Sequence, residues 1–164
     1  MPANLTIPAL DGFSLEYGAT PFTEAAPILP GQVVEPRGYV NFSNIDGGAP
    51  GVKLCYGTAN LSKKFITIAY IEVEPESRNR GVGKDIVRKL EAFGAELGCR
   101  EVRGQSVAES EVFWEKMGYS LRGRGEGKRK GIHRSLEERC PGLAARVSIQ
   151  KAAKKGTRQY LDCV

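Results

Sequence analysis

The chain has 164 residues, a length that suits one compact domain with a single hydrophobic core. Its 41% hydrophobic and 26% charged residues exclude a largely disordered chain, a collagen-like chain and a disulfide-rich miniprotein. The net charge of +5 is uneven, because residues 1–99 hold 9 basic and 11 acidic residues, whereas residues 100–164 hold 15 basic and 8 acidic residues. A basic C-terminal part is compatible with binding an anionic small molecule, a nucleic acid or an acidic protein, and net charge does not distinguish among these partners.

The first half of the chain predicts an extended lead-in followed by strands. Residues 1–37 carry six prolines and no apolar stripe with helical spacing, so we predict an irregular, extended segment. Three segments rich in β-branched and aromatic residues follow, and each predicts a strand. They are YVNF from Tyr39, VKLCYG from Val52 and FITIAYIEV from Phe65 to Val73.

After Pro75 the apolar spacing becomes helical, with steps of three and four residues. The residues that form this stripe are Val82, Ile86, Leu90, Phe93 and Leu97. We predict that the helix ends at Gly98, since glycine is common just after a helix C-terminus.

The C-terminal part predicts further strands and helices. The expected elements are a strand at Glu101–Val107, a helix at about Glu109–Met117, strands at Tyr119–Gly123 and Ile132–Leu136, and a helix from Leu143 to about Lys154. Strands that lead into helices and back predict an α/β (α+β) fold with a mixed sheet. We expect one domain over 1–164, with the lead-in at 1–37, a core at 38–136 and a C-terminal extension at 137–164.

The segment from Ile71 to Lys84, IEVEPESRNRGVGK, predicts a strand, a short polar loop and a helix start. The first N–H groups of a helix lack intrahelical partners, and the helix dipole favours an anion there. Gly81 and Gly83 would let a phosphate approach the backbone, although two such glycines can also belong to an ordinary tight turn. The cations around them are Arg78, Arg80 and Lys84. Because the common nucleotide motifs are absent, the pattern predicts another phosphate-bearing cofactor.

Two motifs in this sequence resemble those of the GNAT superfamily of N-acetyltransferases. The stretch VEPESRNRGVGK from Val73 is similar to its acetyl-CoA signature, R/Q-x-x-G-x-G/A after a strand that ends in Val-x-Pro, and Arg78, Gly81 and Gly83 fill the fixed positions. FWEKMGY from Phe113 is similar to a second segment, usually Phe-Tyr-Glu-Lys-Leu-Gly-Phe. The two motifs stand in the order that this fold requires, with a helix and a strand between them.

The resemblance implies a GNAT-like mixed, mostly antiparallel, twisted sheet flanked by helices, with splayed central strands that hold acetyl-CoA. It implies direct transfer of the acetyl group to a primary amine of an unidentified acceptor, small molecule or protein, with coenzyme A as the product. Loop amides would hold the pyrophosphate, and strand backbone would face the pantetheine arm. The cofactor-binding residues implied are Ile71, Val73, Arg78, Asn79, Arg80, Gly81, Val82, Gly83 and Lys84.

The catalytic positions depart from the family pattern. Trp114 stands where the family often has a tyrosine that protonates the thiolate, so it is either a hydrogen-bond donor there or an aromatic wall. The family's asparagine falls near Val107, and the nearby serines, Ser106 and Ser110, are possible substitutes.

The general base is also open, because Thr67 occupies the position where some members have a glutamate. Glu72 is a candidate base or an ordinary solvated or salt-bridged carboxylate. Regular alternation would place Glu72 and Thr67 on opposite faces of the strand, whereas a bulge, which the resemblance implies, would reverse this.

The acceptor side is the least defined part of the sequence. Residues 10–37 do not predict the two helices that the family places after its first strand, so loops or a partner subunit of a homodimer would build that side. Two alternatives to an active enzyme stay open: a catalytically degenerate acyl-CoA-binding module, and a nucleic-acid-interaction module. The latter would use Arg122, Arg124, Lys128, Arg129, Lys130 and Arg134.

Other features predict neither a membrane protein nor a metal centre. No apolar run reaches the roughly 20 residues of a membrane-spanning helix, and the N-terminus lacks the pattern of a secretory signal, so we expect a cytoplasmic protein. The four cysteines are widely spaced without a C-x-x-C pair, and His133 is the single histidine.

Overall fold

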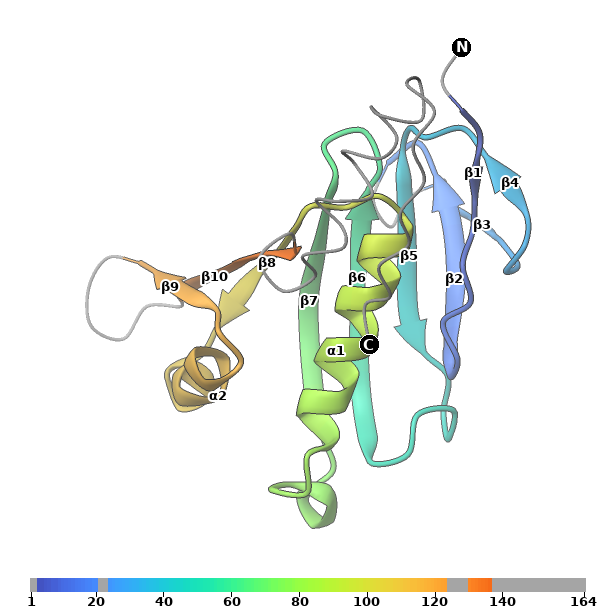
Figure 1. Ribbon diagram of the computed structural model, residues 1–164. Coiled ribbons are helices and arrows are strands. Elements are labelled where there is room, and N and C mark those ends of the chain that lie inside the picture. The colour runs from blue at the N-terminus through green and yellow to red at the C-terminus, as the bar shows by residue number, and fades with distance from the viewer. Residues whose placement is uncertain (1–2, 21–23, 124–129, 137–164) are drawn as a thin grey trace, which may run out of the picture.

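The computed structural model of the chain describes residues 3–20, 24–123 and 130–136 (Figure 1). The strands in these residues are β1 (Leu5–Thr6), β2 (Phe13–Gly18), β3 (Ala26–Pro27), β4 (Val33–Val34), β5 (Tyr39–Asn44), β6 (Val52–Asn60), β7 (Phe65–Val73), β8 (Glu101–Ser106), β9 (Ser120–Arg122) and β10 (Lys130–Ser135). The α-helices are α1 (Val82–Glu96) and α2 (Glu111–Lys116), and short 3-10 helices precede them at Pro75–Ser77 and Ala108–Ser110.

One large sheet dominates the described structure. Its eight strands lie in the order β3-β2-β5-β6-β7-β8-β10-β9. Only β7 and β8 run parallel, and the other neighbours are antiparallel. β1 and β4 pair separately. The predicted fold class, a mixed and mostly antiparallel sheet with flanking helices, is therefore confirmed.

The lead-in is more regular than the sequence indicated. It is extended, as predicted, but Phe13–Gly18 forms a six-residue strand that pairs along its length with β5. Phe13 and Leu15 are buried while Ser14 and Glu16 are exposed, the alternation of a half-buried strand. The other predicted strands and the first helix are confirmed, and the second helix is shorter than expected. The helix predicted from Leu143 to Lys154 lies outside the described residues.

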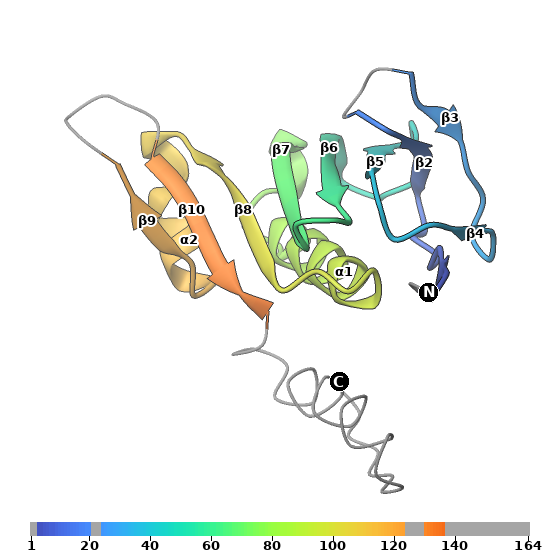
Figure 2. The ribbon, with the colours of Figure 1, turned by 90° about the horizontal axis from the view of Figure 1, so that it is seen from above.

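The core lies between the central strands and α1, which packs along β6 and β7 (Figure 2). The Phe42 ring meets the rings of Phe13 and Phe93 edge to face, with centroids 6.2 and 6.3 Å away. A Cβ at Gly57 would lie 2.1 Å from the Thr67 carbonyl oxygen and 2.5 Å from the Phe42 ring, so only glycine fits there. The residues that α1 buries include Ile86, Val87, Leu90 and Phe93.

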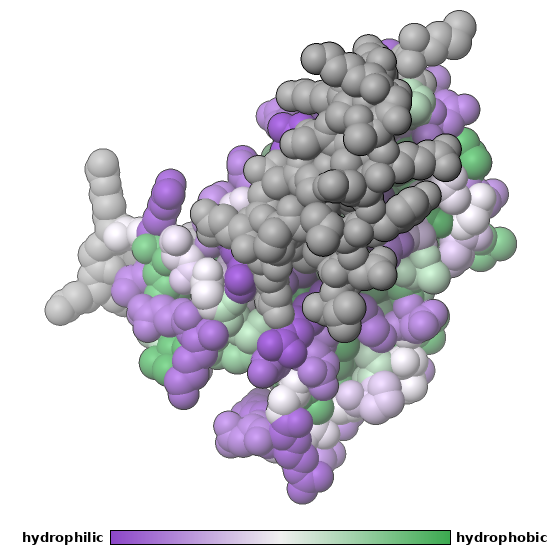
Figure 3. Space-filling model, in the orientation of Figure 1, coloured by the Kyte–Doolittle hydropathy of each residue, from purple (hydrophilic) through white to green (hydrophobic). Residues whose placement is uncertain are grey.

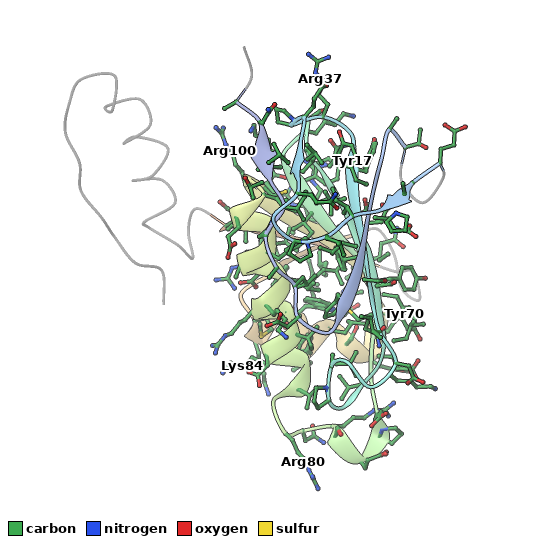
Figure 4. The ribbon with its side chains drawn as sticks, turned by 90° about the vertical axis from the view of Figure 1, so that its right-hand side faces the viewer. Tyr17, Arg37, Tyr70, Arg80, Lys84 and Arg100 are labelled. Carbon is green, nitrogen blue, oxygen red and sulfur yellow. The ribbon has the colours of Figure 1, made fainter. Side chains whose placement is uncertain are left out.

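The opposite face of the sheet carries polar and aromatic side chains, and in the described part of the chain no helix covers it. We call it the helix-free face. One row of cross-strand neighbours on this face consists of Glu16, Asn41, Thr58, Thr67, Arg103 and His133. Figure 4 shows Tyr70 on this face and α1 on the other side of the sheet.

Candidate functional site

β7 and β8 separate partway along their length. Their parallel pairing ends at Ile68 opposite Gly104, although β7 continues to Val73. On its other side β7 stays paired with β6 as far as Val73. The β8-facing backbone groups of residues 69–73 therefore have no partner strand in the described structure, and Figure 1 shows the strands diverging. This confirms the predicted splay and leaves strand backbone available to an extended ligand. We call this segment the open edge.

A β-bulge lies where the strands separate. Tyr56 and Gly57 are neighbours on β6, but their partners on β7 are Tyr70 and Ile68. Ala69 is therefore an extra residue without a partner, which defines a bulge. The bulge implied by the resemblance is present.

The bulge reverses the side-chain alternation of β7. Ile68 is buried in the core before it, and Ile71 packs against the core after it. Tyr70 and Glu72 consequently point to the helix-free face, the face that Thr67 also occupies. Of the two arrangements that the sequence left open, the structure has the one in which Glu72 and Thr67 share a face.

The loop between β7 and α1 folds back on the end of the strand. Arg78 Nε donates a hydrogen bond to the Val73 carbonyl oxygen at 3.2 Å, and the Glu74 N–H donates to the Gly51 carbonyl oxygen at 2.9 Å. Asn79 has a φ of 59°, in the left-handed region. The loop therefore lies beside the open edge, at the end of the molecule where hydrophilic residues gather in Figure 3.

Gly81 is the N-cap of α1 and leaves open space beside the first turn of the helix. Its φ is 82°, and a Cβ built on it would have no atom within 4 Å. The Asp85 N–H donates to the Gly81 carbonyl oxygen at 3.0 Å, which starts the helical hydrogen bonds. The N–H groups of residues 82–84 precede that bond and have no intrahelical acceptor. Space and N–H groups at a helix start are the requirements of an anion site.

Gly83 differs from Gly81, because its surroundings are filled. A Cβ there would lie 3.4 Å from the Phe113 ring and 3.7 Å from Val73 Cγ2, which are ordinary van der Waals distances. The start of α1 therefore lies against both α2 and the end of β7. This contact connects the two sequence motifs in space.

The three predicted cations are spread around the loop. Arg78 turns back to the strand through its bond to the Val73 carbonyl oxygen. In Figure 4 Arg80 extends from the end of the molecule and Lys84 points outward on the side of α1. They are balanced in number by three carboxylates on the same segment, Glu74, Glu76 and Asp85.

Trp114 lies in the core, with 3% of its surface exposed. Its ring meets those of Phe113 and Tyr119 edge to face, with centroids 5.0 Å away in each case. The Tyr119 hydroxyl in turn donates to Glu91 Oε1 on α1 at 3.0 Å. The packing role of Trp114 is therefore visible, and its contact with a thiolate stays a prediction.

The serines near the second motif are bonded to one another. Ser106 is fully buried, and its Oγ lies 2.9 Å from that of Ser110. The Val107 carbonyl oxygen lies within hydrogen-bond distance of both hydroxyls, at 2.9 and 3.1 Å, and the two hydroxyl protons are shared among these three contacts. These bonds hold the end of β8 and the start of α2 together next to the open edge.

Glu72 belongs to a cluster of four side chains on the helix-free face, which we call the Glu72 cluster: Lys53, Tyr56, Tyr70 and Glu72. Lys53 Nζ lies 3.0 Å from Glu72 Oε1, and the Tyr70 hydroxyl donates to Glu72 Oε2 at 3.1 Å. The Tyr56 and Tyr70 rings stack, with centroids 5.9 Å apart. The bonds from Lys53 and Tyr70 lower the pKa of Glu72, and the bond to Glu72 raises the pKa of Tyr70. Glu72 is thus a carboxylate at neutral pH and a weak base.

Sequence reasoning identified Glu72 but missed the other three members of its cluster. Tyr70 stands two residues before Glu72 in the same predicted strand, so alternation would place their side chains on one face. Tyr56 lies in the preceding predicted strand. The pairing of Tyr56 with Tyr70 depends on the bulge, and Lys53 lies within a second register irregularity, between Val52 and Leu54. Neither the bulge nor the second irregularity can be recognised from the amino-acid sequence of a single strand.

Two of the basic residues considered for nucleic-acid binding, Lys130 and Arg134, are engaged in local contacts. Lys130 Nζ pairs with Glu111 Oε2 at 2.9 Å. Arg134 Nη1 donates to the Met117 carbonyl oxygen. Arg124, Lys128 and Arg129 lie outside the described residues.

Two further structural findings concern metals and membranes. Within residues 3–20, 24–123 and 130–136, no group of three or more metal-ligating side chains comes together. None of the helices described is long and apolar enough to cross a membrane.

Comparison with known proteins places residues 31–119 within the model of the acetyltransferase (GNAT) family. A predicted acetyltransferase from Agrobacterium tumefaciens is 11% identical, with a TM-score of 0.50 over 59% of this chain and 75% of that chain. An acetyltransferase from Bacillus cereus is 20% identical, with a TM-score of 0.48 over 59% of this chain and 72% of that chain. The Agrobacterium protein shares the fold. No curated protein gave a significant match.

Proposed function

The chain belongs to the acetyltransferase (GNAT) family, whose model matches residues 31–119 of its 164, and we propose that it transfers an acetyl group from acetyl-CoA to a primary amine. The amine belongs to a small molecule or a protein and attacks the thioester directly. The observation that carries this proposal is the open edge of β7 beside the glycine loop that starts α1. These two features offer strand backbone and helix N–H groups to one extended, phosphate-bearing ligand.

The residues around the loop fit a pyrophosphate. The backbone N–H groups of residues 79–84 would hold it, in the space that a Cβ at Gly81 would occupy. Arg78 and Arg80 would add charge at its flanks. The backbone of Ile71 and Val73, within the open edge, would hold the pantetheine arm.

When bound, acetyl-CoA would supply a thioester carbon that an amine can attack. A backbone N–H of the open edge, directed at the thioester carbonyl, would stabilise the negative charge that develops on its oxygen. The amine loses a proton in the reaction, and the departing thiolate gains one.

Glu72 and Trp114 enter the proposed reaction through charge and packing, and neither is proposed to transfer a proton. Because Lys53 and Tyr70 lower its pKa, Glu72 supplies negative charge beside the acceptor more readily than it removes a proton. Water would then carry the proton away. Trp114, packed between Phe113 and Tyr119, would act as an aromatic wall behind the cofactor site.

Thermal unfolding with and without acetyl-CoA tests the cofactor site, because a ligand of the folded state raises Tm. At a ligand concentration of about 100 Kd the stabilisation is about 2.7 kcal/mol, which corresponds to several degrees. Gly81→Glu should abolish the shift, since its side chain enters the phosphate space. Gly31→Glu is the matched control, because Gly31 also has a positive φ of 86° and nothing within 4 Å of its Cβ.

The outcomes separate the alternatives. A shift that Gly81→Glu removes and Gly31→Glu keeps supports the cofactor site, and acetylation of members of an amine panel then supports the enzyme. A shift without turnover on any amine favours a degenerate acyl-CoA-binding module. No shift with either acetyl-CoA or coenzyme A contradicts the proposal.

A further inference from the structure

The Glu72 cluster lies on the same stretch of β7 as the open edge. Tyr70 and Glu72 are residues of the segment 69–73, whose backbone lacks a partner strand on the β8 side. Their side chains point to the helix-free face, whereas Ile71 packs toward the core. A molecule resting on this face would therefore reach the open edge from the side opposite α1.

An alkylammonium group already occupies the cluster. Lys53 Nζ lies 3.0 Å from Glu72 Oε1, and the Tyr70 hydroxyl bonds the other oxygen of the same carboxylate. The Tyr70 ring stacks on that of Tyr56, and rings together with a carboxylate form a favourable environment for a cation. The lysine side chain thus shows which chemical group this surface accepts.

The cluster is built so that its cation can leave while its carboxylate stays. The Lys53 side chain is 61% exposed, compared with 28% for Glu72. The Tyr70 hydroxyl holds the second oxygen of Glu72 at 3.1 Å and does not depend on Lys53. Exposed ion pairs of this kind are weak, so a second cation can replace the lysine at low cost.

We propose that Glu72, Tyr70 and Tyr56 form the binding site for the ammonium group of the acceptor, and that this group displaces Lys53. The acceptor class is then an aliphatic primary amine that is protonated at neutral pH, such as the end of a lysine side chain or of an alkylamine. The description of this cluster as an acceptor site rests on the proposed acyl transfer. The binding of the ammonium group itself does not require a thioester.

NMR titration of the protein with n-butylamine, without acetyl-CoA, tests the binding step through the ring signals of Tyr56 and Tyr70. Lys53→Met should strengthen binding about two- to fivefold, because it removes the competing cation. Glu72→Gln should weaken binding about tenfold, because it removes the charged acceptor of the hydrogen bond. Aniline, which is largely uncharged at neutral pH, should bind far more weakly than n-butylamine.

A second ion pair on the same face provides the control. Glu101 pairs with Arg103 at 2.9 Å, so Glu101→Gln removes a carboxylate of similar surroundings outside the cluster. It should leave the titration unchanged. A purely structural role of Lys53 predicts no gain in affinity in Lys53→Met.

Unchanged or weaker binding in Lys53→Met, or unchanged binding in Glu72→Gln, overturns the proposal. In an active enzyme the same variants should move KM for an alkylamine in opposite directions with little change in KM for acetyl-CoA. Failure of the acetyl-CoA thermal shift would overturn the acyl transfer, whereas the butylamine titration judges the ammonium site separately.

Discussion

The two faces of the central strands come from alternate residues of the same segments, yet they have different tasks. Toward α1 the strands present apolar side chains packed so closely that a methyl group at Gly57 would clash. Toward the helix-free face they present hydroxyls, carboxylates and tyrosines held by weak contacts. Folding therefore depends on the first face, and ligand recognition is free to use the second.

The largest difference between the faces should appear at two neighbouring residues of β6. Gly57→Val places atoms against the Phe42 ring and the Thr67 carbonyl, and we expect it to cost about 3 kcal/mol or more, enough to prevent stable folding. Thr58→Val loses the hydrogen bond from Thr58 Oγ1 to Asn41 Oδ1, for about 1 kcal/mol. Urea unfolding measures both, and equal losses would contradict the contrast.

Tyrosine hydroxyls on the two faces offer a second comparison. Tyr119→Phe leaves the buried carboxylate of Glu91 without the bond at 3.0 Å, at a cost of about 1–3 kcal/mol. Tyr70→Phe removes the bond to the more exposed Glu72, and we expect a loss of less than about 0.5 kcal/mol. A larger loss for Tyr70→Phe in the same urea assay would mean that the helix-free face carries more of the stability than we infer.

A charge change should act locally on the helix-free face. Because Lys53 lowers the pKa of Glu72, Lys53→Met should raise that pKa toward its ordinary value. In the parent the lowered pKa contributes stability above the unfolded pKa of the carboxyl, and acidification through the folded pKa removes it. NMR titration of the carboxylates measures the shift, and Arg103→Met should raise the pKa of Glu101 while leaving Glu72 unchanged.

Thiol reactivity gives the mildest comparison, because it leaves the structure intact. Burial raises the pKa of Cys55 to about 12, so its thiol is protonated and shielded at neutral pH. It should react with iodoacetamide only when the protein unfolds. Leu54→Cys, at the neighbouring exposed position, should react in the folded state, and mass spectrometry distinguishes the two sites.

The parts of this fold that the sequence predicted are those with a strong local period or motif. The helical stripe from Val82 and the glycines of the loop are local patterns, and both were found where expected. β2 was missed because prolines on both sides obscured a six-residue alternation. The Glu72 cluster depends on cross-strand register and on the extra residue Ala69, neither of which a single strand's sequence records.

The open edge of β7 also bears on how the protein behaves in concentrated solution. A row of strand N–H and C=O groups without a partner is a template for pairing with another chain. In this protein the row lies between two strands of one sheet. Charged residues or prolines usually protect the edge of a sheet, but at this place they would obstruct a ligand. Under the proposed function, acetyl-CoA would cover this row, so protein without acetyl-CoA should self-associate at lower concentrations than protein saturated with it, which light scattering can measure.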